Sequence, residues 1–150
     1  IAFVFFTSRH SFKERQYIWQ SRSYILVFKL MPNKYVNAKK DLTGTSETTL
    51  YTAPALTTAI VKSILVSEDS GNADTITVTI TDAESSPATF SLFKTKSISA
   101  NATAELLTAP LVVETGEILK VTAATANRLH VVASILEISW CQLLIVIHNY

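Results

Sequence analysis

Apolar and polar residues alternate along much of the chain between residues 47 and 139, a pattern typical of half-buried β-strands. The alternation is clearest at residues 59–68, where Ile60, Lys62, Ile64 and Val66 share one face, and at residues 73–82. In the second run Ile76, Val78 and Ile80 recur at every second position. Residues 67–74 between the runs are rich in turn formers. The pattern therefore predicts one long β-hairpin with a solvated, acidic tip.

Similar short runs occupy the rest of this region, and turn residues separate them at intervals of roughly 8–12 residues. The predicted elements are an arm or edge strand at 34–42, strands at 47–52, 89–96 and 103–108, an extended segment at 112–117, and a closing hairpin of 118–123 with 128–139. About eight short strands predict an all-β fold, an antiparallel β-sandwich that is jelly-roll-like.

Composition divides the chain into a middle region and two flanks. Residues 1–30 carry five Lys or Arg against one Glu and hold eight of the fourteen aromatic residues, whereas residues 31–139 carry eight Lys or Arg against eleven Asp or Glu. We interpret 31–139 as the β-sandwich domain, and 1–30 and 140–150 as extensions. Because Met31 is the only methionine, residues 1–30 are interpreted as translated upstream sequence. The alternative for residues 1–30 is a basic aromatic arm that binds nucleic acid or a membrane surface. The alternative for residues 140–150 is a last strand.

Few residues are candidates for chemistry. The chain has three histidines: His10, His130 and His148. No two of them have the spacing of metal ligands, and His130 alternates with apolar neighbours, so we expect it to face solvent or another subunit. Cys141 is the only cysteine, which excludes an intrachain disulfide and a Cys-based metal cage and suits a reducing compartment. No serine lies in a Gly-x-Ser-x-Gly elbow, and three glycines could hardly form a phosphate loop.

Three polar features have a structural and a functional interpretation. The segment from Glu68 to Asp74 could offer oxygen ligands to calcium, but its spacing does not match a calcium loop, and turn chemistry explains the same residues. Asn101 begins a formal glycosylation sequon, which is silent without secretion. Lys94 and Lys96 could contact an anion, or could protect the edge of a sheet. We expect no enzyme, with no catalytic residue, no cofactor and no metal site.

Two segments carry a resemblance to a known family. Residues 50–66 (LYTAPALTTAIVKSILV) and 106–121 (LLTAPLVVETGEILKV) resemble recurrent runs of small virion structural proteins of tailed phages, marine cyanophages among them. Residues 129–138 fit the family's final strand, and Leu56 stands where the family run has glycine. The resemblance covers about 31–139 and implies a virion component of tail, fibre or capsid decoration, with no catalytic or cofactor residue.

The expectation is therefore a non-enzymatic structural protein of a phage virion, assembled in the host cytoplasm. It would associate with other virion proteins and with copies of itself through edge strands and an apolar face. We expect no nucleic acid or membrane partner. The alternative is a β-sandwich module that recognises carbohydrate or a host receptor, which predicts exposed aromatic residues clustered on loops.

Overall fold

The computed structural model describes residues 23–29, 33–139 and 142–148, with side chains described for 33–139. The chain divides into two compact units, one of Ile1–Met31 with Trp140–Tyr150 and one of Pro32–Ser139. In the first unit β1 (Ser23–Lys29) pairs antiparallel with β11 (Gln142–His148). His10, Met31 and Cys141, on which several of the interpretations above rest, lie outside the described residues.

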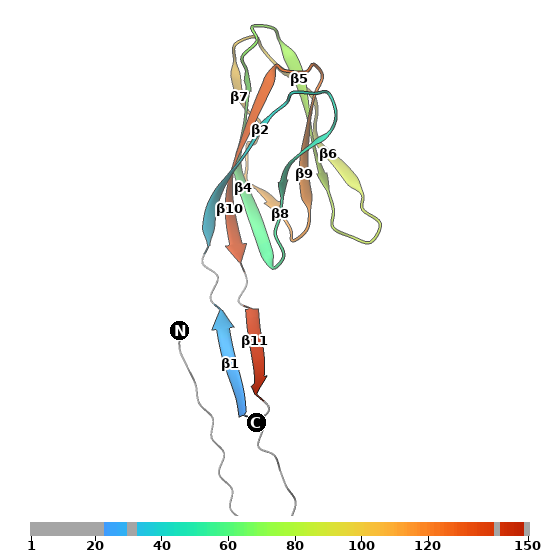
Figure 1. Ribbon diagram of the computed structural model, residues 1–150. Coiled ribbons are helices and arrows are strands. Elements are labelled where there is room, and N and C mark those ends of the chain that lie inside the picture. The colour runs from blue at the N-terminus through green and yellow to red at the C-terminus, as the bar shows by residue number, and fades with distance from the viewer. Residues whose placement is uncertain (1–22, 30–32, 140–141, 149–150) are drawn as a thin grey trace, which may run out of the picture. The chain divides into compact units, whose positions relative to one another are not determined.

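The second unit is an antiparallel β-sandwich, which confirms the predicted fold class (Figure 1). Within residues 33–139 the structure has nine strands and no helix. They are β2 (Lys34–Asp41), β3 (Thr48–Thr52), β4 (Thr57–Glu68), β5 (Asp74–Thr81), β6 (Thr89–Ile98), β7 (Thr103–Glu105), β8 (Leu111–Val113), β9 (Ile118–Ala123) and β10 (Leu129–Ser139).

The strands form two sheets. One has the order β2-β10-β4-β7, and β8 also pairs with β4 beside β7; the other has the order β3-β9-β5-β6. The segment predicted as an arm or edge strand is β2, which lies at one end of its sheet. Most connections between consecutive strands cross from one sheet to the other, whereas β5 and β6 form a hairpin within one sheet.

Both predicted hairpins are wrong in their pairing. β4 pairs with β10, β7 and β8, while β5 pairs with β6 and β9, so the two strands of the first predicted hairpin lie in opposite sheets. β9 pairs with β3 and β5, so it is likewise separated from β10. Turn-rich segments between alternating runs are compatible with a hairpin and with a connection that crosses the sandwich. Alternation identifies the buried face of a strand and leaves its neighbours undetermined.

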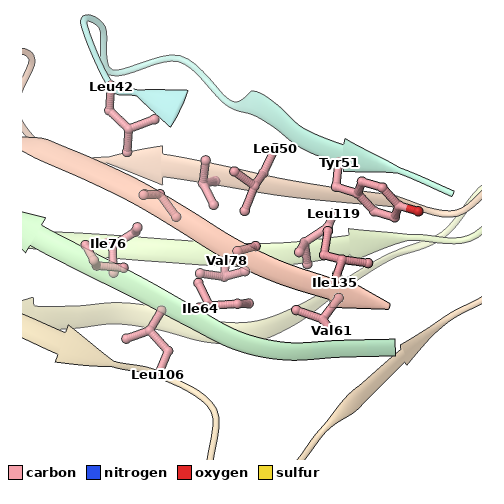
Figure 2. Close-up of a cluster of buried hydrophobic side chains, with 14 of the residues drawn as sticks. Leu42, Leu50, Tyr51, Val61, Ile64, Ile76, Val78, Leu106, Leu119 and Ile135 are labelled. Carbon is pink, nitrogen blue, oxygen red and sulfur yellow. The ribbon is translucent and has the colours of Figure 1, made fainter. Parts of the chain in front are cut away.

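The core lies between the two sheets and consists of aliphatic side chains with one tyrosine (Figure 2). Val61, Ile64 and Val66 come from β4, and they face Ile76 and Val78 of β5 from the opposite sheet. Full burial of one such side chain contributes about 1.5–3 kcal/mol, so these alternating positions hold the layers together.

A β-bulge in β4 changes which residues of that strand are buried. Ser134 pairs with Ser63 and Ile135 with Val61, so β4 has one extra residue, Lys62, at this point. The extra residue reverses the inward and outward alternation, because strand side chains have a period of two. Val61 and Ile64 both enter the core, and Ile60 points to the outer face. The prediction that Ile60 shares the face of Ile64 is therefore wrong.

Several turns hold a residue with positive φ, and two of these residues are Leu56 and Gly116. Leu56, in the turn between β3 and β4, has a φ of 57° and is 45% exposed. Gly116, in the turn before β9, has a φ of 83°, and a Cβ atom added there would lie 3.0 Å from the Cβ of Ala83. Glycine adopts this conformation at little cost, and a leucine does not.

Strand β6 lies at the end of its sheet and is irregular. Its register with β5 shifts twice, and Thr95 has a φ of 49°. Lys94 and Lys96 flank this residue and are exposed. Bulges and lysines are the features that prevent an edge strand from pairing with another chain, so this arrangement matches the protective interpretation of the two lysines.

Candidate interaction surface

An apolar row crosses the outer face of the sheet that contains β4 and β10. Residues paired directly across antiparallel strands lie on the same face of a sheet. Leu136 pairs with Tyr35 on one side and with Ile60 on the other, and Ile60 pairs with Val112. Tyr35 is 74% exposed and Val112 is 53% exposed, while the two central residues are half-buried. Four apolar side chains from four strands thus form a continuous band toward solvent.

A second row on the same face has charged ends. Val132 pairs with Lys39 of β2 and with Leu65 of β4, and Leu65 pairs with Glu105 of β7. Leu65 is 41% exposed, and the two charged side chains are exposed at opposite ends of the row. From β2 to β7 the row therefore consists of a positive, two apolar and a negative side chain. We call these two rows together the outer patch.

Polar side chains separate and border the two rows of the outer patch. Between them Ser134 pairs with Asn37 and with Ser63. Beyond the second row, at the other end of the face, His130 pairs with Asp41 and with Ser67.

The Glu105 carboxylate is fixed at its end of the second row. Its Oε1 atom accepts hydrogen bonds from the backbone N–H groups of Ile64 at 2.8 Å and Leu107 at 3.0 Å, and its Oε2 accepts one from the Ser63 hydroxyl. Burial acts to raise the pKa of Glu105, but these hydrogen bonds outweigh it and lower the pKa below its ordinary value. The carboxylate is consequently ionised at neutral pH.

His130 lies between two carboxylates. Its Nε2 atom is 3.3 Å from Oδ1 of Asp41, and its Nδ1 atom is 3.4 Å from Oδ2 of Asp69. The ring is about half exposed, which agrees with the sequence prediction that it faces outward. Only a doubly protonated ring donates to both carboxylates, and these side chains link β2, β10 and the segment after β4.

The acidic segment after β4 is a structural junction, which corrects its interpretation as a solvated hairpin tip. Glu68 is only 3% exposed. Its Oε1 accepts from the Ser70 N–H at 2.7 Å, the Asn72 N–H at 3.3 Å and the Ser70 hydroxyl. Its Oε2 accepts from the Asn101 N–H at 2.7 Å and the Gly71 N–H at 3.2 Å. Five hydrogen bonds from the protein thus satisfy both oxygens of the Glu68 carboxylate.

Hydrogen bonds also explain the charge state of Glu68. The Ser70 hydroxyl has the largest effect, burial opposes it, and the N–H groups of Asn101, Ser70 and Asn72 add to it; together they lower the pKa of Glu68 to about 2. At the other end of this segment Asp74 is buried, and its Oδ2 accepts from the Thr125 N–H at 3.0 Å. Both carboxylates therefore stabilise loops.

The remaining candidates stay apart. Among residues 33–139, whose side chains are described, no three His, Cys, Asp or Glu side chains gather as metal ligands. Asn101 is exposed in the turn before β7, with a φ of 54°. The part of the chain that the structure describes contains no helix with the length and apolar character needed to cross a membrane.

Sequence reasoning missed the outer patch. It assigned Ile60 to the core, and it had no means of pairing Tyr35 with Leu136, since these residues are 101 positions apart. One signal was available: Ile60 and Val61 are adjacent apolar residues in a predicted strand, and two neighbours cannot both face one core without a bulge.

Comparisons with known proteins give little further information. The chain matches no protein-family model and no curated protein. Three chains of solved structures match it, among them one from the structure of infectious bursal disease virus Gt strain. That match has a TM-score of 0.39 and 10% sequence identity, and it covers 80% of this chain and 34% of the viral chain. A likeness at this level supports no inference about function.

Proposed function

We propose that the protein is a non-enzymatic structural component of a phage virion, as part of the tail, a fibre or the capsid decoration. The observation that carries the proposal is the resemblance of residues 50–66 to the virion structural proteins of tailed phages. In this chain that segment forms the end of β3, a turn and most of β4. On this proposal the protein assembles with other virion proteins in the host cytoplasm.

Backbone conformation gives the resemblance a physical basis. The family run has glycine at the position of Leu56, and the φ of Leu56 is 57°, in the region that favours glycine. Gly116 lies in the second segment of resemblance and has a φ of 83°. A chain with this backbone would favour glycine at both positions.

The strand order also supports the proposal. β7 and β8 both pair with β4, so they can be counted as one strand broken in two. The sandwich then has eight strands in two sheets of four, and we propose that it is a jelly roll. This architecture is common in viral capsid domains and in lectins.

The outer patch favours assembly over recognition of a sugar. A carbohydrate site would gather exposed aromatic side chains. The exposed aromatic residues among those described, Tyr35 and Phe90, lie on β2 and β6, in different sheets. The outer patch holds only one of these aromatic residues, Tyr35, beside aliphatic side chains, and its second row has charged ends, as in a protein interface with an apolar core and a polar rim.

The test is the protein content of purified particles. Particles of the phage that carries this gene are banded on a density gradient, and their proteins are identified by mass spectrometry. We expect peptides from residues 34–139 in the particle band, while a phage replication enzyme, as control, stays in the soluble fraction. Genes for tail or capsid proteins should flank this gene. Absence from the particles, or a place within a metabolic operon, contradicts the proposal.

A further inference from the structure

We infer that the outer patch binds the outer patch of a second copy of this chain, face to face, about a two-fold axis parallel to β4 and β10. This inference deepens the proposed function, on which it rests for its biological setting, because it names the partner and the symmetry of one contact. It is carried by the order of charges along the second row of the patch.

The charge order makes the patch complementary to itself. Across four strands the second row is Lys39, Val132, Leu65 and Glu105. A two-fold axis that runs between β10 and β4 exchanges the two ends of the row on the facing copy. Lys39 then faces Glu105 of the second copy, and Val132 faces its Leu65. The Lys39–Glu105 pair is attractive and, like the Val132–Leu65 contact, it occurs twice, as a two-fold interface requires.

The other rows agree with the same axis. In the apolar row Tyr35 faces Val112 of the second copy and Leu136 faces its Ile60, so the apolar side chains of each copy cover those of the other. Ser134 faces Ser63 of the second copy, and His130 faces its Ser67. The two Lys39 side chains stay roughly 14 Å apart laterally, because three interstrand spacings separate the ends of the row. The same axis therefore suits three further rows of the face.

A different two-fold axis brings like charges together. If the axis ran across the strands along the second row, each Lys39 would face Lys39 of the other copy and each Glu105 would face Glu105. The Glu105 carboxylate is held in place by its backbone donors, so it could not turn away from such a contact. The charge order thus selects the axis parallel to the strands.

The size of the face predicts a weak dimer. Four strands about eight residues long cover an area of about 19 Å by 26 Å. The two copies would bury roughly 1,000 Å² in total, at the lower limit of specific interfaces. We therefore expect a dissociation constant in the micromolar range, which suits a contact that is reinforced by others within a particle.

The first experiment measures association of the full chain by sedimentation velocity, from ~1 to ~100 µM, a range that covers micromolar dissociation constants. We expect the sedimentation coefficient to rise toward that of a dimer. Lys39→Glu and Leu65→Gln should each raise the dissociation constant about tenfold or more. The matched controls are Lys40→Glu, next on the same strand but paired with buried Val131, and Phe90→Gln, an exposed residue of the other sheet. Both controls should leave association unchanged.

The second experiment tests the axis by mixing two charge variants. Lys39→Glu alone and Glu105→Lys alone should each associate poorly, because like charges would face one another twice. An equimolar mixture should regain association to within about threefold of the wild type, since both facing pairs in the mixed dimer are again of opposite sign. Circular dichroism of each variant checks folding. If Glu105→Lys does not fold, the comparison of Lys39→Glu with Lys40→Glu still decides.

Three results overturn the inference. They are a wild-type protein that stays monomeric to ~100 µM, equal effects of the patch variants and their controls, and a mixture no better than its components. Presence of the protein in purified particles together with any of these results would leave the proposed function intact and reject this contact alone. A protein that self-associates as expected but is absent from the particles would leave this contact intact and reject the proposed function.

Discussion

The backbone N–H of Asn101 donates a 2.7 Å hydrogen bond to the carboxylate of Glu68, 33 residues earlier in the chain. The bond joins the end of β4 to the turn before β7, and the N–H of Glu68 in turn donates to the carbonyl of Ala102 at 2.9 Å. One buried carboxylate thereby fixes two connections that run between the sheets.

Replacing Glu68 with glutamine should destabilise the sandwich. Each oxygen of the Glu68 carboxylate accepts hydrogen bonds from two backbone N–H groups. In glutamine one of these oxygens is replaced by an NH₂ group, which cannot accept, so at least two donors lose their acceptor. We expect Glu68→Gln to lower the midpoint of thermal unfolding measured by circular dichroism. Glu84→Gln in an exposed loop is the control and should change it little. Equal midpoints for the two variants would contradict the structural role of Glu68.

The same carboxylate predicts how stability depends on pH. The pKa of Glu68 falls from an ordinary value of 4.5 to about 2 in the folded protein. Above about pH 4.5 both states are ionised, and the full stabilisation is present. As the pH falls from 4.5 toward 2, the unfolded state takes up a proton that the folded state does not, and the stabilisation is lost. Urea unfolding at pH 7, 4 and 2.5 should show a steeper loss for the wild type than for Glu68→Gln. Parallel pH profiles would count against this account.

Leu56→Gly should stabilise the protein. A leucine with a φ of 57° costs roughly 1 kcal/mol relative to glycine, and the side chain is 45% exposed, so its removal forfeits little burial. We expect a gain of about 0.5–1 kcal/mol in the free energy of unfolding. Ala55→Gly, at the preceding residue of the same turn, should cause a small loss, because glycine there only adds freedom to the unfolded chain. A loss at both positions would be inconsistent with strain at Leu56.

Gly116→Ala should have the opposite effect. The added methyl group meets the Cβ of Ala83 at 3.0 Å, and the φ of 83° disfavours any side chain. We expect a loss of about 1–3 kcal/mol in the free energy of unfolding from urea titration. Gly44→Ala is the control, because an added Cβ there meets no atom within 4 Å. If the two substitutions cost the same, the turn before β9 is more adaptable than the structure indicates.

The strands and the fold class could be predicted from sequence, because burial on one face imposes a period of two wherever it occurs. The pairing could not. Whether residues 67–74 turn back along the same sheet or cross to the other depends on hydrogen bonds to Ala102 and Arg128, far away in sequence. The burial of Glu68 depends on the same distant contacts. Local composition treats it like any acidic turn residue, and only the folded chain brings Asn101 to it.

The sequence predicted the type of interaction surface but not the residues that form it. Edge strands and an apolar face were expected, but the members of that face depend on the bulge at Lys62, which exchanges the roles of Ile60 and Val61. One extra residue in a strand cannot be recognised from the alternation of apolar and polar residues, because a single exception to the alternation is common in any strand. Neighbours across the sheet, such as Lys39 and Val132, follow from topology alone.

The position of β10 has a consequence for synthesis of the protein. This strand lies between β2 and β4, and it pairs Asp41 with His130, 89 residues later. Until residues 129–139 have left the ribosome, the sheet lacks one of its two inner strands, and β2 has no neighbouring strand with which it can pair. Closing so long a loop is slow, and unpaired strand edges promote aggregation while it happens. Folding of the sandwich is therefore completed only after translation of β10, and a nascent chain that stalls before it leaves the edges of β2 and β4 unpaired.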